Sequence, residues 1–292
     1  MGHDQLFKSL LEGALPAFLE LFFPHVAKKL NFTTSRFLDK ELFTGFPDGS
    51  LREADVVAEL KTHEGEPELV LIHIEVQARA EKEFGKRMYE YYALLQLRYR
   101  VPVFPIVMYL QGGEGLTEAE YRVVLFGHEQ LRFRYMSLGL ARLEPREYVE
   151  KSPVGAALAA LMNRAREADP FELRAAILRK IGWSGLNDAL KFLLVNIVET
   201  YFPLTGEEEQ RFRQLLAERG YREVEEMEVT WADKMMARGK RETLLRQLTA
   251  KFGEPSEETK ARVEAIESAE ELDTYLERIL TASSIEDMGL GS

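Results

Sequence analysis

The sequence predicts a mixed α/β protein in its first half and a mainly helical one in its second. Apolar residues recur at helical spacing near the start of the chain, and short runs that alternate apolar with polar residues follow them. A helical pattern then separates the two most apolar strand candidates. The order helix, strand, hairpin, helix, strand is that of an α/β fold, and from about Lys151 to Arg246 the pattern is predominantly helical.

The first helix is predicted in DQLFKSLLEGALPAFLELFF, where leucine and phenylalanine recur at helical intervals. Pro16 lacks a backbone N–H and is expected to divide this segment into two helices. Residues 37–43, FLDKELF, are the candidate first strand. The segment FPDGS that follows is predicted to be a turn, because proline, aspartate and glycine each favour turn conformations.

The next two strands are predicted at residues 54–62, ADVVAELKT, and 69–77, LVLIHIEVQ. The short polar segment HEGEPE between them indicates a hairpin. Residues 81–100 then carry an apolar stripe typical of a helix, and VPVFPIVMYL is typical of a buried strand. Beyond it, YRVVLF and LRFRYMSL alternate in the manner of strands.

Composition limits the classes of function. The 292 residues include no cysteine, which excludes disulfides, thiolate metal sites and cysteine nucleophiles. A net charge of −11 argues against a protein that coats nucleic acid through bulk charge, although a local basic channel stays open. No apolar run approaches the roughly 20 residues that span a bilayer, and the opening MGHDQLFKSL does not resemble a signal peptide. We therefore expect a cytoplasmic protein with no membrane partner.

One strand carries an unusual set of polar side chains. In VLIHIEVQAR, the apolar residues Ile72, Ile74 and Val76 share one face of an extended chain, together with Val70. The other face carries His73, Glu75 and Gln77. This face is either exposed to solvent, as one face of an antiparallel sheet often is, or it forms part of a functional site.

The predicted hairpin places a second carboxylate beside this face. Paired residues of an antiparallel hairpin have a constant index sum, and a turn centred on Gly65 pairs Asp55 with Glu75 and Val57 with His73. Directly opposed Cβ atoms lie about 4.5 to 5.5 Å apart, so the two carboxylates repel one another. A shared hard cation such as Mg²⁺ would relieve this repulsion, because it prefers carboxylate oxygens. A register slip of one residue would remove the pairing.

Four segments resemble one family of nucleases. They lie within residues 3–140 and read HDQLFKSLL, READVVAEL, IHIEVQAR and GKRMYEYYALL. These motifs resemble the Rpn family of recombination-promoting nucleases, which belongs to the PD-(D/E)XK superfamily. GKRETLLRQLTAKFGEPSEE and ELDTYLERILTASSIEDM resemble a small helical domain commonly attached to these proteins. The resemblance implies a restriction-endonuclease-like core of order α-β-β-β-α-β at residues 1–145, a helical extension packed on it at 146–235 and a small helical domain at 236–292.

The resemblance also assigns roles to residues. It makes Asp55, Glu75 and Gln77 the catalytic residues of a Mg²⁺-dependent DNA endonuclease, with Mn²⁺ as a substitute metal. Asp55, Glu75 and the backbone carbonyl of Val76 would bind the metal. Gln77 stands where the superfamily has lysine, so it offers amide hydrogen bonds in place of a positive charge.

Four further residues are candidates for supporting roles. Arg87 and Tyr91 lie one helical turn apart on the helix that flanks the site in the family, where they would contact DNA, although Tyr91 also suits the core. His73 is either an accessory to catalysis or a structural histidine. Glu12, on the first helix, is either a further acidic group near the metal or part of a surface ladder of ion pairs.

The leading hypothesis is thus a Mg²⁺-dependent DNA endonuclease, linked by its family to recombination or mobile elements. A second hypothesis is a nuclease-fold protein that cleaves poorly or not at all and acts as a DNA-binding or protein-interaction module. A third is a structural oligomer built on the helical half. The partner expected under the first hypothesis is DNA, and the sequence leaves open whether the chain is a homodimer.

Overall fold

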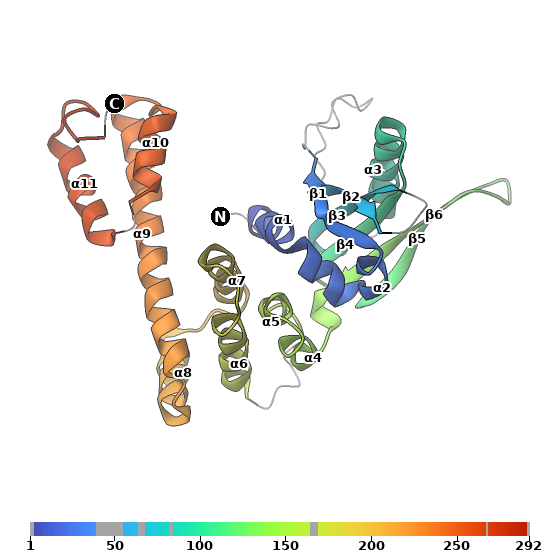
Figure 1. Cartoon of the computed structure of the whole chain (residues 1–292), viewed down its shortest axis with the longest axis horizontal. Helices are drawn as coiled ribbons and strands as arrows, with labels where there is room; N and C mark the ends of the chain where they lie inside the picture. The colour runs from blue at the N-terminus through green and yellow to red at the C-terminus, as the bar shows by residue number, and fades with distance from the viewer. Residues whose placement is uncertain are drawn as a thin grey trace. The chain divides into compact units, whose positions relative to one another are not determined.

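The computed structural model describes residues 3–38, 55–63, 68–81, 84–163, 169–266 and 268–290. The chain forms two compact units, Met1–Leu215 and Leu216–Ser292. The first unit is a mixed α/β structure, as predicted, and the second is helical (Figure 1). Among the described residues, every helix is too short or too polar to cross a membrane.

A six-stranded sheet organises the first unit, with the strand order β1-β2-β3-β4-β6-β5. β1, β2 and β3 are antiparallel, β4 runs parallel to both β3 and β6, and β5 is antiparallel to β6. The bounds are β1 Leu30–Phe37, β2 Val56–Thr62, β3 Leu69–Arg79, β4 Val103–Gln111, β5 Leu116–Leu125 and β6 His128–Gly139.

The first strand lies earlier than predicted. β1 ends at Phe37, so only the first residue of FLDKELF belongs to it, and residues 39–43 lie outside the described part of the chain. β1 is an edge strand in which only Leu30 is buried. The Asn31 side chain accepts hydrogen bonds from the Thr33 backbone N–H and hydroxyl beside an irregularity in the register of the strand. An exposed strand of this kind lacks the apolar alternation on which the prediction relied.

The hairpin of β2 and β3 has the predicted register. Val57 pairs with His73, and Val56 and Ala58 pair with Ile74 and Ile72, so each pair of indices adds to 130. Asp55 lies immediately before β2. The turn expected around Gly65 falls within residues 64–67, which are outside the described ranges.

Helices cover both faces of the sheet (Figure 1). α1, His3–Phe22, contains a break at Ala14 beside Pro16, as predicted, and it packs on β2 and β3. The short α2, Pro24–Ala27, follows it. On the other face lies α3, Phe84–Tyr99, which packs its apolar side chains against Val57, Leu71 and Val107. The face that bears His73 and Glu75 is therefore buried at this point, and the alternative that it is exposed to solvent is wrong for these two residues.

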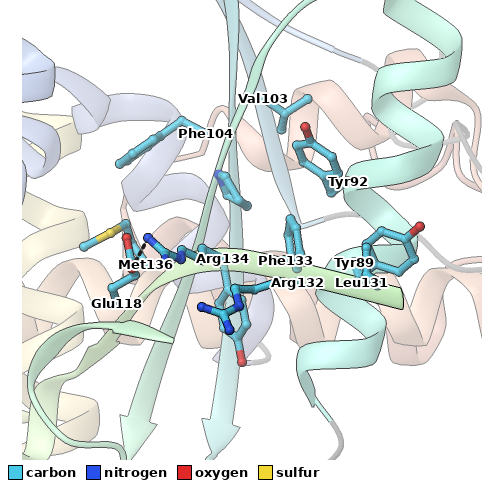
Figure 2. Close-up of a pocket in the computed structure, with 12 residues that line it drawn as sticks. Tyr89, Tyr92, Val103, Phe104, Glu118, Leu131, Arg132, Phe133, Arg134 and Met136 are labelled. Carbon is cyan, nitrogen blue, oxygen red and sulfur yellow. Dashed lines mark ion pairs between the residues drawn. The ribbon is translucent and has the colours of Figure 1, made fainter. Parts of the chain in front are cut away.

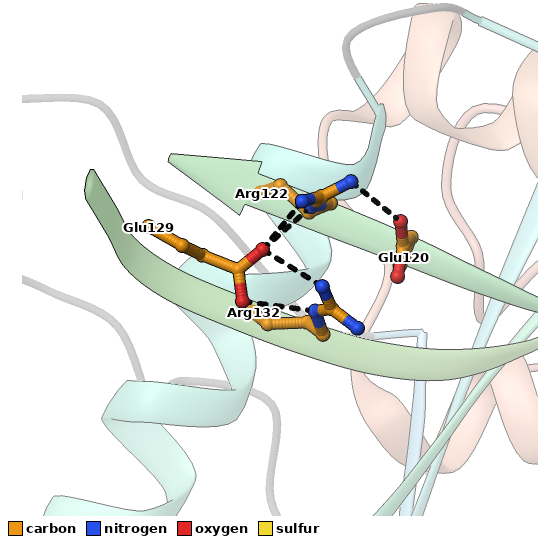
Figure 3. A network of polar contacts seen from close by, with 4 residues as sticks. All are labelled: Glu120, Arg122, Glu129 and Arg132. Carbon is orange, nitrogen blue, oxygen red and sulfur yellow. Dashed lines mark hydrogen bonds and ion pairs between the residues drawn. The ribbon is translucent and has the colours of Figure 1, made fainter. Parts of the chain in front are cut away.

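β5 and β6 form a long hairpin that ends in a two-residue turn. Phe126 and Gly127 both have positive φ, 50° and 79°, as a type I′ hairpin turn requires. One face of the hairpin carries Tyr121, Phe133 and Tyr135, which pack near α3. The other face carries a network of charged side chains, Glu120, Arg122, Glu129 and Arg132 (Figure 3). Hydrogen bonds from Arg132 and Arg122 hold the pKa of Glu129 below its ordinary value.

The rest of the first unit is helical, as predicted. Phe7 and Phe22 of α1 make ring contacts with Tyr201 and Tyr148, so these helices pack on α1. Arg174 is buried, pairs with Glu199 and donates to the Phe202 carbonyl. The elements are the 3₁₀ helix η2 Leu140–Arg142, α4 Pro145–Val149, α5 Pro153–Ala159, α6 Pro170–Gly182, α7 Asp188–Tyr201 and α8 Gly206–Arg219, which extends past the limit of the unit.

The second unit has its own core, formed by α9 Arg222–Phe252, α10 Glu257–Glu264 and α11 Ala269–Thr281. The expected domain limit between residues 235 and 236 falls inside α9. Basic residues of α9 hold the unit together: Lys240 bonds Asp273 at 2.6 Å, and Arg241 donates to the carbonyls of Glu264 and Ile266.

Candidate functional site

The candidate site lies where β2 and β3 part. β2 begins opposite Ile74, whereas β3 continues to Arg79. Asp55 fills this gap, because its Oδ2 accepts the Val76 backbone N–H at 2.7 Å. The Asp55 backbone N–H in turn donates to Oε1 of Glu75 at 3.2 Å. The structure therefore brings Asp55 and Glu75 together, as the register predicted.

Glu75 is buried and held from two sides. Its side chain is 3% exposed, and the same Oε1 lies 2.8 Å from Nε2 of His73, which is fully buried. An ionised carboxylate only accepts hydrogen bonds, so we assign the proton to Nε2 of His73. Nδ1 of His73 is buried with no partner among the described residues. His73 thus has one strong contact, and that contact fixes Glu75.

Val76 adds a third oxygen at the same place. In an extended strand the N–H and C=O of one residue point to the same side, so the Val76 carbonyl faces the side on which Asp55 lies. Two carboxylates and a carbonyl form a donor set that suits Mg²⁺, which keeps several of its waters. The residues predicted to bind a metal therefore fit one. The described ranges show no cluster of three or more histidine or acidic side chains arranged for a metal.

Gln77 lies one step beyond Glu75 on the same face and is half-buried. Its neighbour across the parallel ladder is Tyr109 of β4. Burial, aided by the adjacent Tyr135, raises the pKa of Tyr109 well above its ordinary value, so its hydroxyl stays neutral. Tyr109 was not among the site residues predicted from the sequence. The signal was available, because Gln77 and Tyr109 are both near the ends of parallel strands.

Arg87 and Tyr91 occupy different environments on α3. The guanidinium of Arg87 lies over the Phe84 ring, 4.3 Å from its centroid, and its charge partly opposes the rise in the pKa of Tyr109. Tyr91 is 4% exposed and meets the His73 ring edge-on, with 5.4 Å between the ring centroids. Arg87 is thus near the Tyr109 end of the site, whereas Tyr91 has the position expected of a core residue that supports His73.

Glu12 lies on an exposed part of α1. α1 covers the face of the sheet opposite α3: Phe18 of α1 packs on Phe23, which meets Phe104 on that face. His73 and Glu75 point to the α3 face. The structure therefore places Glu12 on the other side of the sheet from these two residues.

Fold and site together define a mixed α/β protein in which a buried carboxylate, Glu75, and a half-buried one, Asp55, meet where two antiparallel strands part. Comparison with family models, with curated proteins and with solved structures finds no match to this chain.

Proposed function

We propose that this chain is a metal-dependent endonuclease that hydrolyses phosphodiester bonds of DNA, with a PD-(D/E)XK-like core. The observation that carries the proposal is the meeting of Asp55, Glu75 and the Val76 backbone at one point. The order of α1, β1, β2, β3, α3 and β4, with β3 and β4 parallel, supports the proposed core.

Each residue of the site has a role under this proposal. Asp55, Glu75 and the Val76 carbonyl would hold Mg²⁺, which supplies charge to polarise the phosphate and lowers the pKa of a bound water. His73 holds Oε1 of Glu75 and so fixes the orientation of the carboxylate. The amide of Gln77 would orient water by hydrogen bonds, since it has no charge to place beside the phosphate. Arg87 is the proposed phosphate contact.

A plasmid-nicking assay tests the proposal. Purified protein should nick supercoiled DNA with Mg²⁺ or Mn²⁺ and not with EDTA, and Glu75→Ala should abolish the activity. Glu59→Ala is the matched control, because Glu59 is a carboxylate of the same hairpin that pairs with the exposed Arg36 at 2.9 Å. Nicking that persists in Glu75→Ala, or is absent from the wild type with either metal, would reject a nuclease site here.

A second candidate function is a DNA-binding or protein-interaction module without cleavage. It is favoured by one feature of the site: Asp55 and Glu75 both accept hydrogen bonds from groups of the protein itself, so they hold the parting strands together without a metal. A salt titration of DNA binding separates the two functions. Salt-dependent binding that weakens in Arg87→Ala, with no nicking, would support the module.

A further inference from the structure

The sheet has a second opening, between β4 and β6. These strands pair only where Ile106–Tyr109 meet Met136–Gly139. Toward the start of β4 they diverge, and an open pocket of about 500 Å³ lies between them (Figure 2). We call this pocket the β4–β6 slot. The slot lies on the β6 side of β4, whereas Asp55 meets β3 on its β2 side, so β3 and β4 lie between the slot and Asp55.

Both walls of the slot are strand edges. Leu131–Tyr135 of β6 pair only with β5 in the described part of the chain, and Val103–Pro105 of β4 pair only with β3. The backbone of each wall is thus paired on one side and open on the other. An open strand edge is a template for a further strand, because its N–H and C=O groups lack partners.

The side chains of the slot divide into two kinds. Phe133 and the nearby rings of Tyr89 and Tyr92 lie on the α3 side, with centroids 5.6 and 5.0 Å from that of Phe133. Arg132 and Arg134 alternate with the aromatic residues along β6 and so project from the other side (Figure 2). Their side chains are 42% and 57% exposed.

The charge of the slot favours an acidic occupant. Two arginines and one glutamate, Glu118, line it. Glu118 lies 3.4 Å from Arg134, and Arg132 pairs at 2.9 Å with Glu129, which lies outside the slot. Ion pairs between exposed side chains contribute little to stability, so an incoming carboxylate replaces such a pair at small cost. The walls require backbone hydrogen-bond partners as well, which an extended peptide provides and a stacked nucleobase does not.

We propose that the β4–β6 slot binds an extended peptide segment of a partner protein, which adds to the open edge of β6 as a strand. Side chains of a strand alternate between the two faces of the sheet. The segment therefore places apolar residues against Tyr92 and Phe133 and acidic residues against Arg132 and Arg134. In this mode of recognition main-chain hydrogen bonds give affinity, and the alternate side chains give specificity.

The test uses synthetic fluorescent peptides and the full chain, with binding measured by anisotropy. The first peptide alternates valine with glutamate. The second has the same composition with all valines before all glutamates, the third replaces glutamate by glutamine, and the fourth carries N-methyl groups on alternate residues. Only the first should bind tightly, because the others lose the alternation, the charge and the backbone donors respectively.

Substitutions locate the bound peptide. Arg134→Ala should weaken the alternating valine–glutamate peptide about tenfold, the scale of a hydrogen bond to a charged group, and leave the glutamine peptide unchanged. Tyr92→Ala should weaken both peptides. Arg36→Ala is the matched control, because Arg36 is an exposed arginine of β1, at the other edge of the sheet, where it pairs with Glu59. Glu75→Ala should bind the peptide as the wild type does, which separates this proposal from the nuclease proposal.

Three results would overturn the proposal. The first is no binding of the alternating peptide by the wild type, and the second is equal binding of the N-methylated peptide. The third is tight binding of single-stranded oligodeoxythymidine that Tyr92→Ala and Arg134→Ala abolish while the peptide does not compete. That last outcome would assign the slot to nucleic acid. Melting curves of each variant confirm that it is folded.

Discussion

The sheet has two openings, one where β2 parts from β3 and one where β4 parts from β6. The two differ in whether the backbone groups at the opening have hydrogen-bond partners. At the first, a carboxylate takes the place of a strand: Asp55 accepts the Val76 N–H, and its own N–H bonds Glu75. At the second, no described strand or side chain closes the gap, and a pocket remains between Val103–Pro105 and Leu131–Tyr135.

The difference lies in what satisfies the backbone. A carboxylate that replaces a strand as hydrogen-bond acceptor brings a negative charge into the sheet. Because Glu75 is buried beside Asp55, two negative charges lie close together there. The closed opening is therefore suited to a cation. At the open one, aromatic and arginine side chains line a pocket.

Removing the carboxylate from the closed opening should have the largest effect. In Glu75→Ala we expect nicking to fall by at least about a hundredfold, because a metal ligand is lost. The free energy of unfolding should also fall by about 1–3 kcal/mol, since the His73 Nε2–H loses its acceptor in a buried environment. Initial nicking rates and urea unfolding measure the two effects. A variant as active as the wild type would remove Glu75 from the site.

The closed opening should also respond to metal when DNA is absent. Mn²⁺ at about a hundred times its Kd should raise the free energy of unfolding by about 2.7 kcal/mol, because only the folded hairpin brings the ligands together. Asp55→Asn keeps an acceptor for the Val76 N–H and loses the charge, so the stabilisation should vanish. Arg134→Ala, in the open slot, should keep it. Thermal melts with and without Mn²⁺ measure this stabilisation in each protein. If Mn²⁺ stabilised Asp55→Asn as much as the wild type, the metal would bind elsewhere.

Substitutions of Gln77 test how much nicking activity the site has without a lysine at this position. Gln77→Ala should lower nicking by about 10- to 100-fold, the range for a group that supports a metal site without binding the metal. Gln77→Lys should retain activity and bind Mg²⁺ less tightly, because its ammonium adds positive charge beside Asp55 and Glu75. Rates measured across a Mg²⁺ titration separate the two effects. If neither substitution changes the rate at any Mg²⁺ concentration, Gln77 is outside the mechanism.

The smallest expected effect concerns alkaline stability beside the site. Burial raises the pKa of Tyr109 in the folded state, so its contribution to stability is complete below the unfolded pKa near 10 and is lost as pH rises above that value. Tyr109→Phe has no proton to lose, and its stability should fall less above pH 10. Urea unfolding at pH values on either side of 10 measures this. If the free energy of unfolding depended on pH in the same way in both proteins, the raised pKa of Tyr109 would be contradicted.

The hairpin and its carboxylates were predictable because they depend on local rules. A constant index sum and a strand period of two were enough to pair Val57 with His73 and to bring Asp55 to Glu75. The packing of α3 over these side chains was not predictable from local rules. Whether His73 and Glu75 faced water depended on where α3 packed, and the interval between α3 and β3 along the chain does not determine that.

Other features were out of reach for the same reason. β1 was misplaced because an exposed edge strand has no apolar alternation. The roles of the basic residues of α9 were equally out of reach, because Lys240 and Arg241 bond groups that lie far along the chain, such as Asp273 and the Glu264 carbonyl. The β4–β6 slot depends on where two strands diverge, and no residue pattern in either strand marks that point.

The charged network of the β5–β6 hairpin has a consequence for solubility. β5 is the last strand of the sheet, so its outer edge is open to strands of other molecules, a common start of aggregation. Glu120, Arg122, Glu129 and Arg132 neutralise one another within one hairpin (Figure 3). A second molecule that packed over this face would have to strip water from four charged groups and gain no new counter-charge. The network therefore disfavours the packing of a second copy of the chain over this face.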